Sequence, residues 1–234
     1  MKIRVVDLET TGRPEDAVKG IVEIGWTDVV VPVGYDLIGG IVYSPHDALV
    51  DPGHPIPPET RAVHHISDAD VAGAMDPGRA CATLMDGMSE DDVFAAHNAE
   101  FEKAFFGGGG RRWICTMQCA KHIFPEAPGF SNQVLRYWLD VDRHIKSPEL
   151  AMPPHRAGPD TYVTAFILHE MLQRVPPEEL IRLTAAPVLL TKVSFGKHKG
   201  RQWSELPWDY LEWVAFKSDM GRDEKHTAKH YLGR

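Results

Sequence analysis

Short apolar runs separated by turn-forming residues fill the N-terminal part of the chain, a pattern that predicts β-strands. The runs follow one another with short polar connections, which favours an antiparallel meander. The next stretch, His46–Pro58, is rich in Pro and Gly and is therefore expected to be a loop. The expected strands are Ile3–Asp7, Ile21–Val30 and Ile38–Tyr43, with turns at Gly34 and Gly39-Gly40.

Helical and strand patterns alternate beyond this loop, so the main part of the chain is expected to be an α/β domain. The longest helical pattern, Asp160–Arg174, follows a polar loop at Asp142–Pro154 and is broken by Val175-Pro176-Pro177. The other expected helices are Pro58–His64, Gly78–Gly87, Glu100–Phe106, Met117–Phe124 and Asn132–Leu139, and the other strands are Val93–His97 and Trp113–Cys115.

Aromatic residues become frequent from Pro187 onward, which predicts a small C-terminal module. Tyr210, Trp213 and Phe216 are spaced to share one face of a helix. Packing of that face into a core is the first explanation, and stacking of nucleic-acid bases on the rings is the alternative. We therefore divide the chain into a main domain, 1–180, and a module, 187–234.

Composition narrows the class of protein. The chain has 234 residues, 43% hydrophobic and 25% charged, which is typical of a soluble globular protein. No apolar stretch is long enough to span a membrane, and the first residues do not resemble a signal peptide. The three cysteines argue against a secreted disulfide framework, so we expect a cytoplasmic protein with no membrane partner.

The first candidate for chemistry is a pair of acids at the end of the first strand. Asp7 and Glu9 are two residues apart, so on an extended chain their side chains point to the same face. Carboxylates held together repel one another, and a divalent cation such as Mg²⁺ or Mn²⁺ relieves that repulsion. Alone, the pair is also compatible with a solvated acidic turn.

Two distant segments extend this acidic pair. The run into His97 and Asn98 is followed by Glu102, and His155 precedes Asp160 by five residues. Pro159 suits the first turn of a helix, so we expect the last helix to start at Asp160. Four acids and a histidine are the groups that two-metal phosphodiester hydrolysis requires.

Together these segments resemble the DEDDh 3′–5′ exonuclease family, whose three motifs occur here in order as DLETTG, HNAEFE and HRAGPD. The segments WICTM and FGKHKG are similar to the exonuclease X branch. The resemblance covers nearly the whole chain. It implies an RNase H-like (DnaQ-like) α/β fold, a central mixed sheet flanked by helices, with a small C-terminal aromatic and basic module.

The resemblance also implies roles for individual residues. It implies that two Mg²⁺ ions, for which Mn²⁺ can substitute, are bound by Asp7, Glu9, Glu102 and Asp160. It also implies that His155 is the catalytic base. Histidine side chains ordinarily titrate near neutral pH, which suits that role. The implied substrate is the 3′ end of DNA, single-stranded or duplex, and the product is a nucleoside monophosphate. Residues expected to bind the substrate are Thr10, Thr11, Gly12, His64, Asn98 and Phe101.

Several of these assignments have alternatives. Thr10 and Asn98 could cap turns instead of holding the 3′ end, and His64 could simply pack the loop. Glu102 stands where the family has Asp, which adds one methylene to the metal ligand. Gly158 stands where the family has a larger apolar residue, which is expected to loosen the approach to Asp160.

The charge distribution points to the C-terminal module as a DNA-binding part. The chain has a net charge of −8, but residues 187–234 hold 9 Lys and Arg against 6 Asp and Glu, a balance of +3. Cations that neutralise phosphates give salt-dependent affinity, and Lys197, Lys199 and Arg201 lie close together in this part. A mildly basic, solvated cap on the domain is the alternative.

Two other functions fit the same motifs. One is an RNA-trimming exonuclease similar to RNase T, and the other is a nucleic-acid-binding or polymerase-associated subunit with weakened catalysis. We favour DNA as substrate, in repair or proofreading-type processing. The sequence does not indicate a polymerase partner or a homodimer.

Overall fold

The computed structural model describes residues 1–32 and 39–233. The turn expected at Gly34 and the first residue of the expected strand Ile38–Tyr43 lie outside the described residues. The chain divides into two compact units, Met1–Thr184 and Ala185–Arg234. Each unit has a hydrophobic core of its own and is described by itself.

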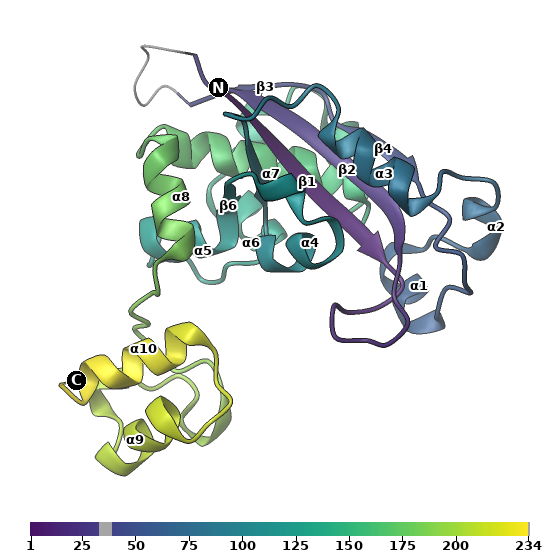
Figure 1. The fold of residues 1–234 in the computed structure, drawn as a ribbon. Helices are drawn as coiled ribbons and strands as arrows, with labels where there is room; N and C mark the ends of the chain where they lie inside the picture. Colours follow the sequence, from purple (N-terminus) through teal and green to yellow (C-terminus); the bar gives the residue numbers. More distant parts are fainter. Residues whose placement is uncertain (33–38, 234) are drawn as a thin grey trace. The chain divides into compact units, whose positions relative to one another are not determined.

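The first unit is built on a six-stranded mixed sheet in the order β3-β2-β1-β5-β6, with β4 also paired to β2 (Figure 1). β1 pairs with β2 in antiparallel and with β5 in parallel orientation, and β5 and β6 are parallel. This confirms the predicted mixed sheet. The strands are β1 (Lys2–Thr10), β2 (Ile21–Val30), β3 (Ile41–Val42), β4 (His46–Leu49), β5 (Val93–Ala96) and β6 (Trp113–Cys115).

Helices cover both faces of this sheet because successive side chains of β1 point to opposite sides. Ile3 and Val5 belong to one core, with residues of α7, and Val6 and Leu8 belong to a second core, with residues of α3. The helices of this unit are α1 (Pro58–His64), α2 (Asp68–Val71), α3 (Pro77–Met85), α4 (Ala99–Phe106), α5 (Thr116–Ile123), α6 (Asn132–Trp138), α7 (Ala157–Leu172) and α8 (Pro177–Ala185).

Helix α7 begins three residues before the predicted start at Asp160. Pro159 is the third helical residue, and in the first turn its missing N–H leaves no intrahelical bond unmade. Nearly all of α7 is buried, since it packs across β1 and β2. Asp160 therefore lies in the first helical turn, at the edge of the sheet.

Three further boundaries differ from the prediction. The Pro and Gly residues of the expected loop His46–Pro58 all follow Leu49, so the segment before them is free to pair with β2 as β4. The expected loop Asp142–Pro154 contains two short 3₁₀ helices, Val141–His144 and Pro148–Ala151. The predicted break at Val175-Pro176-Pro177 is present, since α7 ends at Leu172, but α8, which starts at Pro177, and α2 were not predicted. Pro is favourable at a first helical position, so the same residue can follow one helix and start the next.

The second unit contains two helices, α9 (Trp208–Phe216) and α10 (Arg222–Tyr231), and short 3₁₀ turns at Gly196–His198 and Trp203–Glu205. Its core surrounds the fully buried Trp203. The predicted core packing of the aromatic face of α9 is wrong for two of its residues, since Trp213 is 41% and Phe216 50% exposed. The buried side of α9 is instead formed by Leu211, Val214 and Ala215.

Hydrophobicity does not indicate membrane insertion of any helix. Across residues 1–32 and 39–233, every helix falls short of the length and apolar character that a bilayer crossing requires.

Candidate active site

Three carboxylates converge at the C-terminal end of β1. Asp7 and Glu9 leave the same face of the strand, and Asp160 reaches them from the first turn of α7. One carboxylate oxygen of each lies within 4.8 Å of the other two. We call these three residues the acidic cluster. Oxygen ligands at such spacing are what a hard divalent cation prefers.

The acidic cluster is electrostatically strained. Burial is the main reason that the pKa of Asp7 is raised well above its usual range, and the charges of Glu9, Glu102 and Asp160 add to it. Burial, followed by Asp160 and Glu23, raises the pKa of Glu9 to about 8. A divalent cation would compensate both causes, because it places positive charge where buried carboxylates repel.

Glu102, on α4, fits the same cation site from a second element. Its side chain is 4% exposed, and burial raises its pKa to about 8. Its buried Oε2 atom has no hydrogen-bond partner among the residues that the structure describes. An unsatisfied buried acceptor is costly, and a cation or a water bound to one would satisfy it. Glu102 lies outside the 4.8 Å group, so an indirect contact through water is compatible with its position.

The segment before α7 holds Asp160 through its backbone. The N–H of His155 donates to Oδ2 of Asp160 over 2.9 Å, and Gln133 approaches Oδ1 at 3.5 Å. His155 has φ of 62°, in the left-handed region that residues other than Gly seldom adopt. Its imidazole is exposed and does not contribute to the acidic cluster. The predicted base therefore lies on a strained lead-in beside the cluster.

A buried ion pair that the sequence did not reveal supports this lead-in. Glu23 lies opposite Glu9 in the β1–β2 ladder and is 1% exposed. Its carboxylate accepts hydrogen bonds from the guanidinium of Arg156 and, over 2.8 Å, from the N–H of Ala157. The available signal was an acid between the apolar residues Val22 and Ile24 of a strand, and an Arg directly after His155. The partners are 133 residues apart, so the sequence alone did not pair them.

Close packing of β2 against α7 also holds the start of α7 in place. A Cβ added at Gly25 would lie 2.2 Å from the backbone of Ala157, and one at Gly158 would lie 2.5 Å from the Asp47 carboxylate. The missing side chain of Gly158 therefore lets the Asp47 carboxylate approach the start of α7 closely. The expectation that it loosens the approach to Asp160 is wrong, because the helix start is buried and tightly packed.

We predict that Arg156→Met destabilises the protein by about 3 kcal/mol, because it leaves the buried Glu23 carboxylate without its counter-ion. The Arg156 side chain is 36% exposed, so water screens part of the interaction. The loss of unfolding free energy is therefore expected at the low end of the range for a broken buried ion pair. Denaturant unfolding measures it. The matched control is Arg182→Met, which breaks an exposed pair with Glu179 and should change little. Equal effects of the two variants would contradict the structural role of the Glu23 pair.

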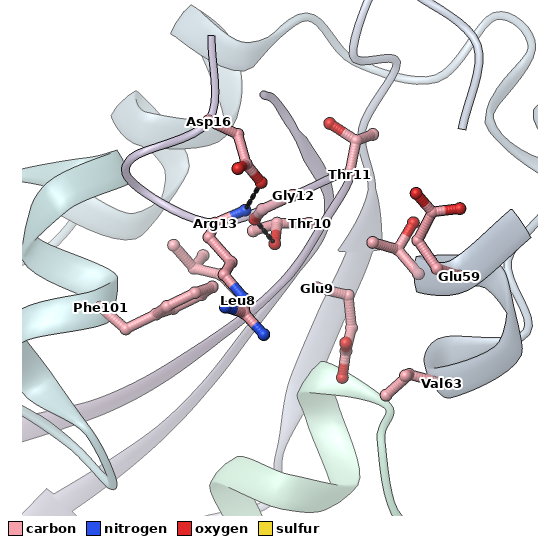
Figure 2. A pocket seen from close by; sticks show the side chains of 11 residues that line it. Leu8, Glu9, Thr10, Thr11, Gly12, Arg13, Asp16, Glu59, Val63 and Phe101 are labelled. Carbon is pink, nitrogen blue, oxygen red and sulfur yellow. Dashed lines mark hydrogen bonds between the residues drawn. The ribbon is translucent and has the colours of Figure 1, made fainter. Parts of the chain in front are cut away.

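Four of the predicted substrate-binding residues line one pocket beside Glu9 (Figure 2). The pocket measures about 400 Å³ and lies between the end of β1 and helices α1 and α4. In Figure 2 the ring of Phe101 points toward Leu8 on the strand. The predicted residues in its lining are Thr10, Thr11, Gly12 and Phe101.

The hydroxyl groups of this strand end are engaged within the protein. Thr10 Oγ1 donates to the carbonyl of Gly12 over 2.8 Å, so its turn-capping role is present. Thr11 Oγ1 accepts from the N–H of Gly20 and contacts Nε2 of His54 at 2.8 Å. These bonds shape the turn, and the backbone of the same turn faces the pocket.

Asn98 and His64 have different surroundings. Asn98 precedes α4 without a side-chain capping bond, which contradicts the capping alternative, and it lines a recess together with Phe101. His64 is 2% exposed, and its Nδ1 accepts from the N–H of Ile66 over 3.0 Å, as expected for a residue that packs the loop. Burial lowers the pKa of His64, and its Nε2 lacks a partner within the described part of the chain.

The predicted DNA-binding cations belong to the second unit. Lys197 and Lys199 are exposed, and Lys197 lines a recess next to α9. Arg201 is also exposed and donates to the carbonyl of Glu205 over 3.0 Å. The three residues lie on one short loop that contains the turn Gly196–His198.

No protein-family model matches the chain. Among curated proteins, exodeoxyribonuclease 10 of Escherichia coli K12 is 30% identical over 236 residues, covering 98% of each chain. DNA polymerase III PolC-type of Listeria monocytogenes is 23% identical over 180 residues, which cover 72% of this chain and 11% of that protein.

Solved structures agree with these relatives. Exonuclease X in complex with 5′ overhanging duplex DNA superposes with a TM-score of 0.60 at 30% identity, covering 78% of this chain and 99% of that one. The nuclease domain of 3′hExo, a DEDDh family member bound to rAMP, gives a TM-score of 0.55 at 16% identity, covering 74% and 92%. The likeness confirms the predicted RNase H-like, DnaQ-like fold of the main domain.

Proposed function

This chain belongs to the exodeoxyribonuclease 10 (exonuclease X) branch of the DEDDh 3′–5′ exonucleases, and we propose that it removes nucleotides from the 3′ ends of DNA with the help of Mg²⁺. The relative is named as an exodeoxyribonuclease, and the alignment with it covers 98% of both chains. This supports DNA as the substrate class. The solved neighbour with the same identity was captured with duplex DNA that carries a 5′ overhang, which is a recessed 3′ end.

The observation that carries this proposal is the acidic cluster, with three carboxylates whose oxygens lie within 4.8 Å of one another. These residues would hold the cations, and Glu102 would complete the site directly or through water. When bound, the cations supply positive charge to the attacking and leaving oxygens of the scissile phosphate. Mg²⁺ suits an all-oxygen site, and Mn²⁺ accepts the same ligands.

The remaining residues position the substrate and move the proton. An imidazole nitrogen of His155 takes a proton from the attacking water, a task for which the exposed ring has room to approach the nucleic acid. The terminal nucleotide enters the pocket formed by the turn after β1 and by Phe101, where backbone groups and an aromatic ring can hold a sugar and a base. Cleavage then releases a nucleoside 5′-monophosphate and leaves a new 3′-hydroxyl.

The direct test uses 5′-labelled single-stranded, blunt and recessed DNA, together with an RNA strand of the same sequence, in Mg²⁺ and in Mn²⁺. We expect a ladder of strands that shorten from the 3′ end, mononucleotide release, and no cleavage in EDTA. Faster digestion of RNA than of every DNA substrate would replace the proposal by an RNA-trimming function. Binding without any mononucleotide release would replace it by a non-enzymatic role.

We predict that Glu102→Asp keeps or raises the rate with Mg²⁺. Mg²⁺ demands near-octahedral geometry, so a carboxylate on a longer arm is the element that fits it least well. Steady-state rates in Mg²⁺ and Mn²⁺ measure the effect, and Glu102→Gln is the matched control that should lose activity. A loss greater than about tenfold in Glu102→Asp, equal to about 1.4 kcal/mol in the barrier, would mean that the buried site has been shaped around Glu.

A further inference from the structure

The second unit presents aromatic side chains that its own core does not use. Helix α9 buries Leu211, Val214 and Ala215, whereas Trp213, on the adjoining face, is 41% exposed. Tyr210, its neighbour on the helix, is half-buried against the core of the unit. The exposed ring of Trp213 is therefore accessible to a ligand beside a second, partly accessible ring.

Trp213 forms one wall of a recess, which we call the α9 recess, of about 460 Å³. Its ring lies 5.6 Å from that of Tyr210 at an interplanar angle of 36°, and His198 packs edge-on to Tyr210 at 4.5 Å. The three rings provide flat faces on which another ring can stack. The lining residues are Lys197, His198, Pro207, Asp209, Tyr210 and Trp213.

Positive charge lies beside these rings. The ammonium of Lys197 is 5.6 Å from the centre of the Tyr210 ring, and Lys199 follows on the same loop. Neither lysine forms an ion pair with a carboxylate within residues 185–233. Both ammonium groups are therefore available to phosphates. The excess of 9 basic over 6 acidic residues in 187–234 also favours binding of phosphates there.

His198 lines the α9 recess with its ring and holds one nitrogen buried. Nε2 of His198 is shielded from solvent and has no hydrogen-bond partner in the described chain. Burial and the charges of Lys197 and Arg201 lower the pKa of His198, which disfavours a charge on its ring. Asp209 is the one carboxylate among the six lining residues, so the recess is not uniformly cationic. Binding there has to use the ring faces as well as the charge.

We propose that the α9 recess binds a base of single-stranded nucleic acid, stacked on Tyr210 and Trp213, with the neighbouring phosphates on Lys197 and Lys199. The proposal rests on the proposed function, since the substrate of the catalytic unit is the nucleic acid that this chain encounters. Stacking on aromatic rings tolerates any base, because every base has a π-face. The recess thus retains the strand without selecting a sequence.

The test measures the affinity of the full-length protein for two fluorescein-labelled oligonucleotides in EDTA, where hydrolysis stops. One is oligo-dT and the other is an abasic strand of equal length and charge. We expect oligo-dT to bind more tightly, and Trp213→Ala or Tyr210→Ala to weaken oligo-dT binding about tenfold while leaving the abasic strand nearly unchanged. Lys197→Glu should weaken both strands and reduce the salt dependence.

Two matched controls lie in the same unit but outside the recess. Phe216→Ala removes a ring of similar exposure from the same helix, and Lys217→Glu reverses an exposed charge at its end. Neither should change the preference for oligo-dT over the abasic strand. Circular dichroism verifies that the variants fold, which matters most for Tyr210→Ala because Tyr210 is half-buried against the core.

The outcome separates this proposal from the proposed function. If Trp213→Ala and Tyr210→Ala bind both strands as the wild type does, the α9 recess is not a nucleic-acid site, whatever the nuclease assay gives. If the wild type releases no mononucleotides but the ring variants lose oligo-dT affinity, the nuclease proposal fails and the recess proposal stands.

Discussion

Replacing Asp7 by alanine should abolish hydrolysis while leaving the fold intact. Asp7 is central to the acidic cluster, since burial and then the charges of Glu9, Glu102 and Asp160 raise its pKa. Its carboxylate would be one of the ligands that hold the cations, whose charge would be worth several kcal/mol at the reacting phosphate, so we expect a loss of at least about 10³-fold. Mononucleotide release under saturating Mg²⁺ measures the rate.

The matched control for Asp7→Ala is Glu100→Ala. Glu100 is also acidic and lies on α4 near the site, but its side chain is exposed and paired with Lys103. Its removal should leave the rate within about twofold, as surface ion pairs contribute little. Near-wild-type activity of Asp7→Ala would contradict the assignment of the acidic cluster as the catalytic centre.

The same variant should change how stability depends on pH. In the folded protein the pKa values of Glu9 and Glu102 are raised from 4.5 to about 8. The folded state therefore binds more protons than the unfolded chain in this range, and the free energy of unfolding falls as pH rises through it. Asp7→Ala removes another group of this kind, so its melting temperature in EDTA should fall less steeply with pH. Mg²⁺ should raise the melting temperature of the wild type more than that of the variant.

Replacing His155 by alanine should lower the rate about 10²–10⁴-fold, the usual contribution of a positioned general base. The cation site should survive, because His155 holds Asp160 through its backbone N–H rather than through its ring. The stabilisation by Mg²⁺ should therefore stay close to that of the wild type, whereas the rate near neutral pH falls. Rate profiles across pH and melting curves with and without Mg²⁺ separate the two effects.

The chain offers a close control for this substitution. His65 is also an exposed histidine in the left-handed region, with φ of 60°, and it lies at the end of α1. His65→Ala therefore reproduces any backbone effect of exchanging such a residue. If His65→Ala and His155→Ala lower the rate equally, or if the pH profile of His155→Ala is unchanged, the base role of His155 is wrong.

The convergence of the acidic cluster was predictable because three ordered motifs resemble those of the DEDDh family, and each acid also follows a local signal. Asp7 and Glu9 end an apolar strand, and Asp160 follows a Pro in the first turn of a helix. Their spacing on a strand and in a first helical turn fixes where the side chains point. Their catalytic roles stay predictions, whereas their proximity is a property of the fold.

The Glu23–Arg156 pair was not predictable in the same way. An acid buried in a strand needs a compensating charge, but the strand does not specify which cation supplies it. The partner is selected by the packing of β2 on α7, which Gly25 permits through its missing Cβ. The exposed face of α9 was missed for a related reason. Periodicity shows that Tyr210 and Trp213 share a side of a helix, but it does not show which of two adjacent apolar sides the core covers.

The position of β1 between β2 and β5 has a consequence for the time at which the enzyme becomes active. β1 pairs in parallel with β5, where Ile3 lies opposite Val93, and the acidic cluster then needs Asp160 from α7. Contacts between residues so far apart in the chain form slowly, and a chain emerging from the ribosome contains its first acids long before the last. A nascent chain that ends before α7 carries Asp7 and Glu9 but no complete cluster. We therefore expect hydrolytic competence to be a late event of folding, and truncated synthesis products to lack it.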